Sequence, residues 1–172
     1  MITLKALATA SAIGVLAAIP VFAQQPAAPA GPAAAPPPLP YGGPISLESA
    51  KKVMAAAEAE AMKNNWQQVI AIVDSSSHLV MLQKLDNTQY GSIRIAEGKA
   101  NTALDFRRPS KVFEDRLANV AGVGALSYGG VIMAEGGVPI AVDGKIVGAI
   151  GVSGGLSSQD SQVAKAGADA VK

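Results

Sequence analysis

The most regular hydrophobic pattern lies in the last third of the chain, where two runs rich in valine and isoleucine flank Asp143-Gly144. This dipeptide tolerates positive φ at both central turn positions, so the pattern predicts a β-hairpin with arms over 136–142 and 145–152. The second arm is apolar at nearly every position, which is typical of a central strand covered on both faces. Pro139 lacks an N–H group and therefore favours an outer position for the first arm.

A second pair of apolar runs occupies 69–74 and 79–85, on either side of the polar turn Ser75-Ser76-Ser77. These runs are rich in β-branched residues and too short for buried helices, so they predict another hairpin, with His78 at its mouth. After a glycine-rich loop, a further short strand is expected at 131–134.

Small and apolar side chains recur at three- and four-residue intervals in four other segments, which predicts four helices. Capping residues and prolines set the limits of these helices. The expected helices are a first from the N-cap Ser46 to Asn64-Asn65, a second over 90–105 that stops before Pro109, a third from Ser110 past Leu117, and a last capped by Ser157 or Ser158. This order predicts an α+β fold with an antiparallel sheet of about five strands covered by helices.

The first 43 residues differ in character from this domain. Lys5 precedes an apolar segment and the small-residue site Val21-Phe22-Ala23, which together predict a secretory signal peptide over 1–23. Residues 24–43 are mostly Pro, Ala, Gln and Gly, a composition typical of a disordered linker. We therefore expect an exported protein, periplasmic or extracellular, whose folded domain spans 44–172.

Charge and cysteine content exclude several classes of function. Removing Lys5 with the leader leaves 13 of the 14 basic residues against 13 acidic residues. This balance argues against nucleic acid as the main partner, and no polybasic patch marks a membrane-binding surface or a stable membrane anchor. The chain has no cysteine, so disulfides, zinc–thiolate sites and cysteine nucleophiles are excluded.

Several segments of the chain match the sequence pattern of a known family. They are Ile72-Val73-Asp74, Ser92–Ala103, Arg108-Pro109-Ser110, Gly136–Ile140 and Gly148–Gly155. From about residue 45 to residue 172 the chain resembles the GlcG/HbpS haem-binding family, which includes domains like the C-terminal part of PduO. The resemblance implies a profilin-like α/β domain, assembly into homo-oligomers, and binding of haem or a corrinoid in some members.

Under this resemblance, His78 is the expected iron ligand, because it is the only histidine and neutral imidazole binds haem iron. The alternative is a solvated turn residue. Asp74 is placed to fix the histidine tautomer or to cap the serine turn. Arg107 and Arg108 suit haem propionates or, equally, a solvated helix end. Thr102 lies on a helix that lines the family's pocket, where it faces a ligand or bonds back to its own helix.

Other side chains are weaker candidates for an axial role, and the methionines among them also suit a hydrophobic core. They are Tyr90, Tyr128, Met81 and Met133.

A catalytic motif competes with this interpretation. Gly151-Val152-Ser153-Gly154-Gly155 fits the G-x-S-x-G pattern of a hydrolase nucleophile elbow, but the only histidine precedes the serine, the reverse of the order in that fold. The leading expectation is an exported oligomeric haem- or tetrapyrrole-binding protein, in haem or iron handling or redox sensing, with a corrinoid as the alternative cofactor. A lyase, isomerase or hydrolase that uses Ser153, Asp160 or Asp143, and an assembly scaffold without catalysis, are the alternatives.

Overall fold

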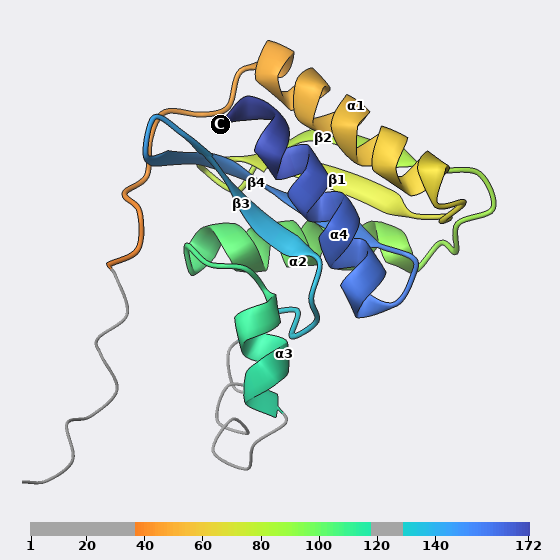
Figure 1. Ribbon diagram of the computed structural model, residues 1–172. Helices are drawn as coiled ribbons and strands as arrows, with labels where there is room; N and C mark the ends of the chain where they lie inside the picture. Colours follow the sequence, from red (N-terminus) through yellow and green to blue (C-terminus); the bar gives the residue numbers. More distant parts are fainter. Residues whose placement is uncertain (1–36, 118–128) are drawn as a thin grey trace, which may run out of the picture. The chain divides into compact units, whose positions relative to one another are not determined.

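A four-stranded antiparallel sheet in the order β2-β1-β4-β3 forms the centre of the domain (Figure 1). The structure is a computed structural model that describes residues 37–117 and 129–172. Its elements are α1 (Leu47–Lys63), β1 (Val69–Asp74), β2 (Leu79–Lys84), α2 (Ser92–Asp105), α3 (Lys111–Leu117), β3 (Gly137–Val142), β4 (Lys145–Ser153), α4 (Ser157–Ala168) and the 3₁₀ turn η2 (Asp169–Val171). The predicted leader over 1–23 lies outside the described residues.

Both predicted hairpins are confirmed. β1 pairs with β2, and β3 pairs with β4 through a turn in which Asp143 and Gly144 have φ of 49° and 72°. Those positive values are the conformation that a two-residue turn between twisted strands requires. β4 pairs with β1 on its other side, so it lies in the interior of the sheet, while β3 with its Pro139 forms one edge.

Two expectations about the C-terminal half were wrong. Residues 131–134 form no strand, and the described sheet has four strands rather than about five. Their backbone groups bond to side chains instead: the N–H of Ile132 donates to Thr102 Oγ1, and Ser110 Oγ donates to the carbonyl of Ala134. The N-cap of α4 is Leu156 and not a serine, because the Gln159 carboxamide oxygen accepts the bond from the Leu156 N–H at 3.0 Å.

Helices cover both faces of the sheet, with α1 and α4 on one side and α2 on the other (Figure 1). The residues of β1 alternate between the two layers. Ile70 and Ile72 belong to the larger core cluster with α1 and α4, whereas Val69 and Ala71 pack toward α2. Burial on both faces explains why a strand of continuous apolar residues is stable here.

The backbone of α2 lies almost directly on the sheet because two glycines face it. Gly137 and Gly151 are paired across β3 and β4. A Cβ atom on Gly151 would collide with the carbonyl of Ala96, and one on Gly137 would collide with the carbonyl of Lys99. The missing side chains thus allow a close approach that no other residue permits.

The folded domain begins within the segment expected to be linker. The Ile146 N–H donates to the carbonyl of Pro40 at 2.9 Å, and the Gly42 N–H donates to the carbonyl of Ile146 at 2.7 Å. The Tyr41 hydroxyl donates to the carbonyl of Leu104 at 2.8 Å. The linker predicted over 24–43 therefore gives way to the domain by residue 40.

A buried ion pair connects the two helical layers. Lys99 Nζ of α2 lies 2.7 Å from Asp160 Oδ2 of α4, and the two side chains are 3% and 2% exposed. Asp160 Oδ1 accepts further hydrogen bonds from Gln68 Nε2 at 2.9 Å and from the Gly155 N–H at 3.0 Å. Burial raises the pKa of Asp160, against the opposing effect of its bond to Lys99. The pair fixes α2 and α4 relative to each other at the end of β4.

We expect Asp160→Asn to lower the free energy of unfolding by about 3–5 kcal/mol, because it leaves the Lys99 ammonium buried without a counter-charge. The double variant Lys99→Met/Asp160→Asn removes that unpaired charge and should recover at least half of the loss. Urea denaturation of the three proteins measures both effects. Equal losses in the single and double variants would contradict this account of the pair.

A second stability prediction concerns the approach of α2. Gly151→Ala should destabilise the domain by about 1–3 kcal/mol, because the added methyl group displaces the α2 backbone. Gly43→Ala is the matched control, since a Cβ there meets nothing within 4 Å and the residue is not among those with positive φ. Thermal unfolding that gives the same midpoint for both variants would refute the steric explanation.

Candidate functional site

Three of the four cofactor-binding candidates lie at the C-terminal end of α2. Thr102 lies in its last turn, and Arg107 and Arg108 follow it directly. The turn between β1 and β2 is bonded to the same place, because Ser77 Oγ donates to Asp105 Oδ1 at 3.0 Å. His78, the next residue, is thereby brought to this end of the molecule.

A cavity of about 380 Å³ lies between this turn and α2. We call it the α2-end cavity; it is lined by Ser77, Asn101, Thr102, Asp105, Phe106 and residues 129–131. The side-chain oxygen of Asn101 is buried and has no hydrogen-bond partner among the described residues. An unmet acceptor in a cavity wall favours a ligand or water that donates a hydrogen bond.

Thr102 serves a structural role at the wall of this cavity. Its side chain is almost fully buried. Its hydroxyl donates to the carbonyl of Gly98 at 2.8 Å, the bond back to its own helix that the sequence left as one alternative, and accepts from the Ile132 N–H at 2.9 Å. Thr102 therefore anchors the segment before β3 to α2, and its proton is already engaged.

His78 is accessible to a ligand. Its side chain is 80% exposed, and its Nδ1 lies 3.8 Å from Asp74 Oδ1, beyond hydrogen-bond distance. The same carboxylate oxygen accepts hydrogen bonds from the backbone N–H groups of Ser76 and His78. Asp74 therefore caps the turn, which is one of the two roles expected for it. The imidazole is therefore exposed and makes no hydrogen bond to Asp74.

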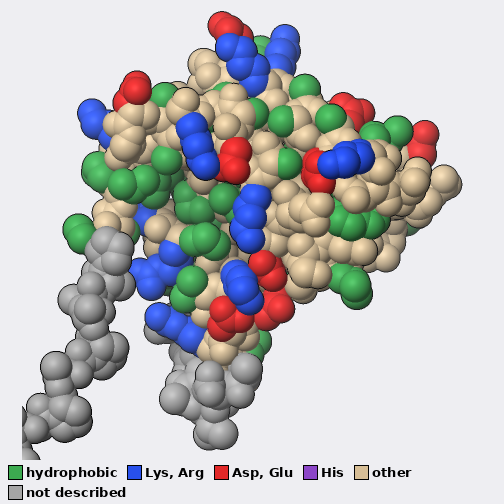
Figure 2. Space-filling view, in the orientation of Figure 1, with side chains coloured by type: hydrophobic (Ala, Val, Ile, Leu, Met, Phe, Trp, Pro, Cys, Tyr) green, Lys and Arg blue, Asp and Glu red, His purple; other side chains and the backbone are tan. Residues whose placement is uncertain are grey.

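The two arginines line a different cavity of about 320 Å³, which we call the arginine cleft. Its wall is apolar and comes largely from β3 and β4, with Val138, Pro139, Ala141 and Ile146. Besides the arginines, Lys172 and Asp169 line the cleft, and these two pair at 2.6 Å, so the two arginines are the unpaired charges among its described lining residues. Figure 2 shows Lys and Arg side chains beside hydrophobic side chains on this face.

Local contacts hold both guanidinium groups. The Arg107 guanidinium carbon lies 5.4 Å from the centre of the Tyr41 ring, a cation–π arrangement. Arg108 Nε donates to the carbonyl of Phe106 at 2.9 Å. Most of the donors of each group remain available, since a guanidinium has five N–H bonds. Phe106 lines the α2-end cavity and directly precedes Arg107, so the two cavities flank the same short segment.

The structure does not bring together the serine and the histidine that the G-x-S-x-G alternative requires. Ser153 is buried at the end of β4 and pairs with Val69, whereas His78 follows Asp74, which pairs with Gly148 at the other end of the same two strands. The histidine and the serine of the G-x-S-x-G motif are thus separated by the length of the sheet. Both carboxylate oxygens of Asp160 are already bonded, Oδ2 to Lys99 and Oδ1 to Gln68 and the Gly155 N–H, so this side chain is not available as a catalytic acid or base.

The remaining candidates are dispersed. Met81 packs against the larger core cluster, and Tyr90 is 85% exposed under the Lys84 ammonium. Met133 is half-buried, and Tyr128 lies outside the described residues. In residues 37–117 and 129–172, no three His, Asp or Glu side chains cluster as a metal site. Likewise, no helix in these ranges is long and apolar enough to span a membrane.

Sequence reasoning missed the ion pair, although the pattern carried a signal for it. Lys99 lies three residues after Ala96 and four before Ala103, on the face of α2 that is otherwise buried alanine. A lysine on that stripe needs a buried anion, and Asp160 in the first turn of α4 supplies it. Tyr41 was missed because the surrounding prolines and glycines made its segment look like linker.

Comparison with known proteins agrees with this fold. Residues 45–169 match the family model described as "Haem degrading protein HbpS-like". Protein GlcG of Escherichia coli strain K12 is 42% identical over 110 residues, covering 63% of this chain and 81% of GlcG. A 15.0 kDa protein of the dhaT-dhaS intergenic region of Citrobacter freundii is 32% identical over 128 residues, covering 73% of this chain and 90% of that protein.

Solved structures share the architecture. A double mutant of HbpS from Streptomyces reticuli is 30% identical with a TM-score of 0.70, covering 82% of this chain and 99% of HbpS. The PduOC:heme complex is 23% identical with a TM-score of 0.68, covering 75% of this chain and 96% of that protein, a likeness of fold. The α+β fold agrees with the profilin-like domain expected from the sequence. Because the family model spans residues 45–169, this chain belongs to the HbpS-like family.

Proposed function

We propose that this protein is exported, assembles into homo-oligomers and binds haem or a related tetrapyrrole at the C-terminal end of α2. The observation that carries the proposal is the arginine cleft, in which Arg107 and Arg108 border an apolar wall. Membership of a family described by haem degradation supports the choice of ligand. We place its role in haem or iron handling or in redox sensing.

The chemistry of the cleft suits the shape of a haem. A haem is a flat apolar ring with two carboxylates on one edge, so it requires an apolar surface bordered by cations. Val138, Pro139 and Ile146 supply the surface. Arg107 and Arg108 supply forked donors, which bind carboxylates more strongly than a single ammonium group does.

The iron would be held by His78, in agreement with its accessible and unbonded ring nitrogens. A neutral imidazole donates a nitrogen lone pair to haem iron, and bound haem supplies redox chemistry or oxygen binding according to its axial ligands. Thr102, the other cofactor-binding residue expected from the sequence, would act by holding the cavity wall, because its proton is bonded to Gly98. The chain's own contribution is thus to bind, orient and shield the ring.

The arginines also distinguish haem from the corrinoid alternative. The edge of a corrinoid carries carboxamides in place of carboxylates, and neutral amides gain less from guanidinium groups. A ligand whose affinity depends strongly on Arg107 and Arg108 is therefore a carboxylate-bearing ring.

Titration of the purified mature protein with hemin, followed at the Soret band, tests the arginine cleft. We expect saturable binding that weakens by about tenfold or more in Arg107→Ala/Arg108→Ala, because charge-assisted hydrogen bonds to the propionates are lost. Arg94→Ala, an exposed arginine of α2 outside the cleft, is the matched control and should bind as the wild type does. Absence of a saturable shift in the wild type would refute haem binding.

His78→Ala tests the iron ligand separately. We expect the variant to retain hemin with the arginines intact, but with a displaced Soret maximum and a changed spin state in the electron paramagnetic resonance spectrum, because the axial nitrogen is gone. Identical spectra for wild type and variant would remove His78 from the site and leave the arginine cleft as the binding determinant.

A further inference from the structure

We infer that a neutral polyhydroxylated compound, a sugar or polyol, binds in a second site around Trp66, at the end of the sheet opposite His78. Two adjoining cavities of about 420 and 390 Å³ share Asn65, Trp66 and Gln67, the link between α1 and β1. We call them together the tryptophan groove. Cavities of this size lie within the usual range for small-molecule sites.

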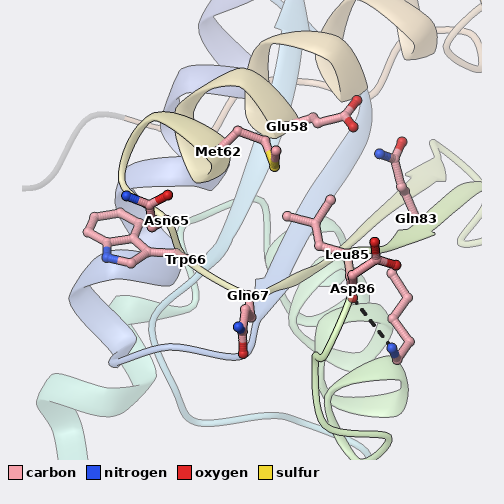
Figure 3. Close-up of a pocket in the computed structure, with 9 residues that line it drawn as sticks. Glu58, Met62, Asn65, Trp66, Gln67, Gln83, Leu85 and Asp86 are labelled. Atoms are coloured by element: carbon pink, nitrogen blue, oxygen red, sulfur yellow. Dashed lines mark hydrogen bonds between the residues drawn. The ribbon is translucent and has the colours of Figure 1, made fainter.

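The groove has one aromatic wall. Trp66 packs partly on the core cluster beneath α1 while its ring stays half-exposed. Figure 3 shows the indole beside Asn65, with Met62 and Glu58 projecting from α1 and Gln83 across the opening. An indole fixed on its inner side is a rigid apolar platform, the kind of surface on which the C–H face of a sugar ring lies.

The remaining lining includes several carboxamides. Five of them, from Asn65, Gln67, Gln83, Asn87 and Gln89, make no side-chain hydrogen bond to any described residue. Gln83 is half-buried and the other four are exposed, so their donors and acceptors are open to a ligand that arrives from solvent. Each carboxamide offers two N–H donors and a carbonyl acceptor. Hydroxyl groups both donate and accept, so a set of unbonded carboxamides matches a ligand with several hydroxyls.

Charge in the groove argues for a neutral ligand. Among the described residues, no ionisable side chain lines the cavity beside Asn87 and Gln89. The other cavity carries two acidic side chains, Glu58 and Asp86, against the single cation Lys84, so its net charge is negative and disfavours an anion. A phosphate or a carboxylate that entered the cavity beside Asn87 and Gln89 would meet no described cation there. The free-energy cost of removing its water would therefore not be offset.

The far wall of the groove is built rigidly. This wall is formed by Gly154 and Gly155. A Cβ on Gly154 would collide with the carbonyl of Gln67, so the two backbone segments are in direct contact. The Gly155 N–H donates to Asp160, whose other bonds run to Gln68 and Lys99. The buried ion pair thus fixes the position of this wall before any ligand arrives, which lowers the entropic cost of binding.

This site is independent of the proposed haem site. Gln67 precedes the start of β1, whereas His78 follows its end, so the two sites lie at opposite ends of the same strand. Failure of hemin binding leaves the tryptophan groove untouched, and the reverse also holds.

Trp66 is the only tryptophan, so its fluorescence reports on the groove alone. We propose titrating the mature protein with glucose, maltose and chitobiose as neutral probes and with glucuronate as the charged counterpart. We expect a saturable change in Trp66 emission with at least one neutral probe, and weaker binding of glucuronate. Saturation-transfer NMR with the same probes gives a second readout that does not depend on the indole.

Gln67→Ala and Asn87→Gly each remove one carboxamide, and glycine keeps the left-handed backbone of residue 87, whose φ is 61°. Each should weaken binding by about three- to tenfold, the effect of losing one neutral hydrogen bond. Gln162→Ala removes an exposed carboxamide outside the groove and should change nothing. The inference is overturned if no probe gives a signal by either method, if Gln67→Ala and Asn87→Gly both bind as the wild type does, or if iodide cannot quench Trp66 in the assembled protein.

Discussion

The close approach of α2 to the sheet is the constraint on which the rest of the structure depends. Gly137 and Gly151 lie opposite each other on β3 and β4, and the backbone of α2 occupies the space that their side chains would fill. With the helix this close, alanines suffice to complete the layer, and the core beneath α2 is made of small residues such as Ala96, Ala100 and Ala103. Packing of small groups at short distance recovers dispersion contacts that larger side chains would otherwise provide.

That approach also sets both ends of the molecule. At one end, α2 carries Arg107 and Arg108 to the edge of β3 and Thr102 to the cavity beside the His78 turn. Toward the other, Lys99 reaches past the end of β4 to Asp160, which holds the loop that borders Trp66. A single helix thereby positions two separate regions of different chemistry, one with two arginines beside an apolar wall and one lined largely by carboxamides.

The sequence predicted the hairpins and helices well because each is encoded locally. Asp143-Gly144 needs only its own backbone preference to specify a turn, and Ser46 caps α1 through a bond to the nearby Ser49 N–H. The predictions failed where residues distant in the sequence determine the local backbone structure. Residues 131–134 have strand-like composition, but Thr102 and Ser110 bind their backbone instead. The sequence places Thr102, Arg107 and Arg108 close together along the chain, but only the fold shows that Thr102 and the two arginines line different cavities and that His78 lines neither.

β1 is paired along its whole length, with β2 on one side and β4 on the other. Six residues of strand hold its two ends about 17–20 Å apart, and shortening or lengthening that spacing would require breaking two ladders at once. Such a strand behaves as a stiff rod between the Trp66 region and the His78 turn. The distance between the Trp66 region and the His78 turn is therefore set by β1, and moving one region toward the other would break backbone hydrogen bonds on both sides of this strand.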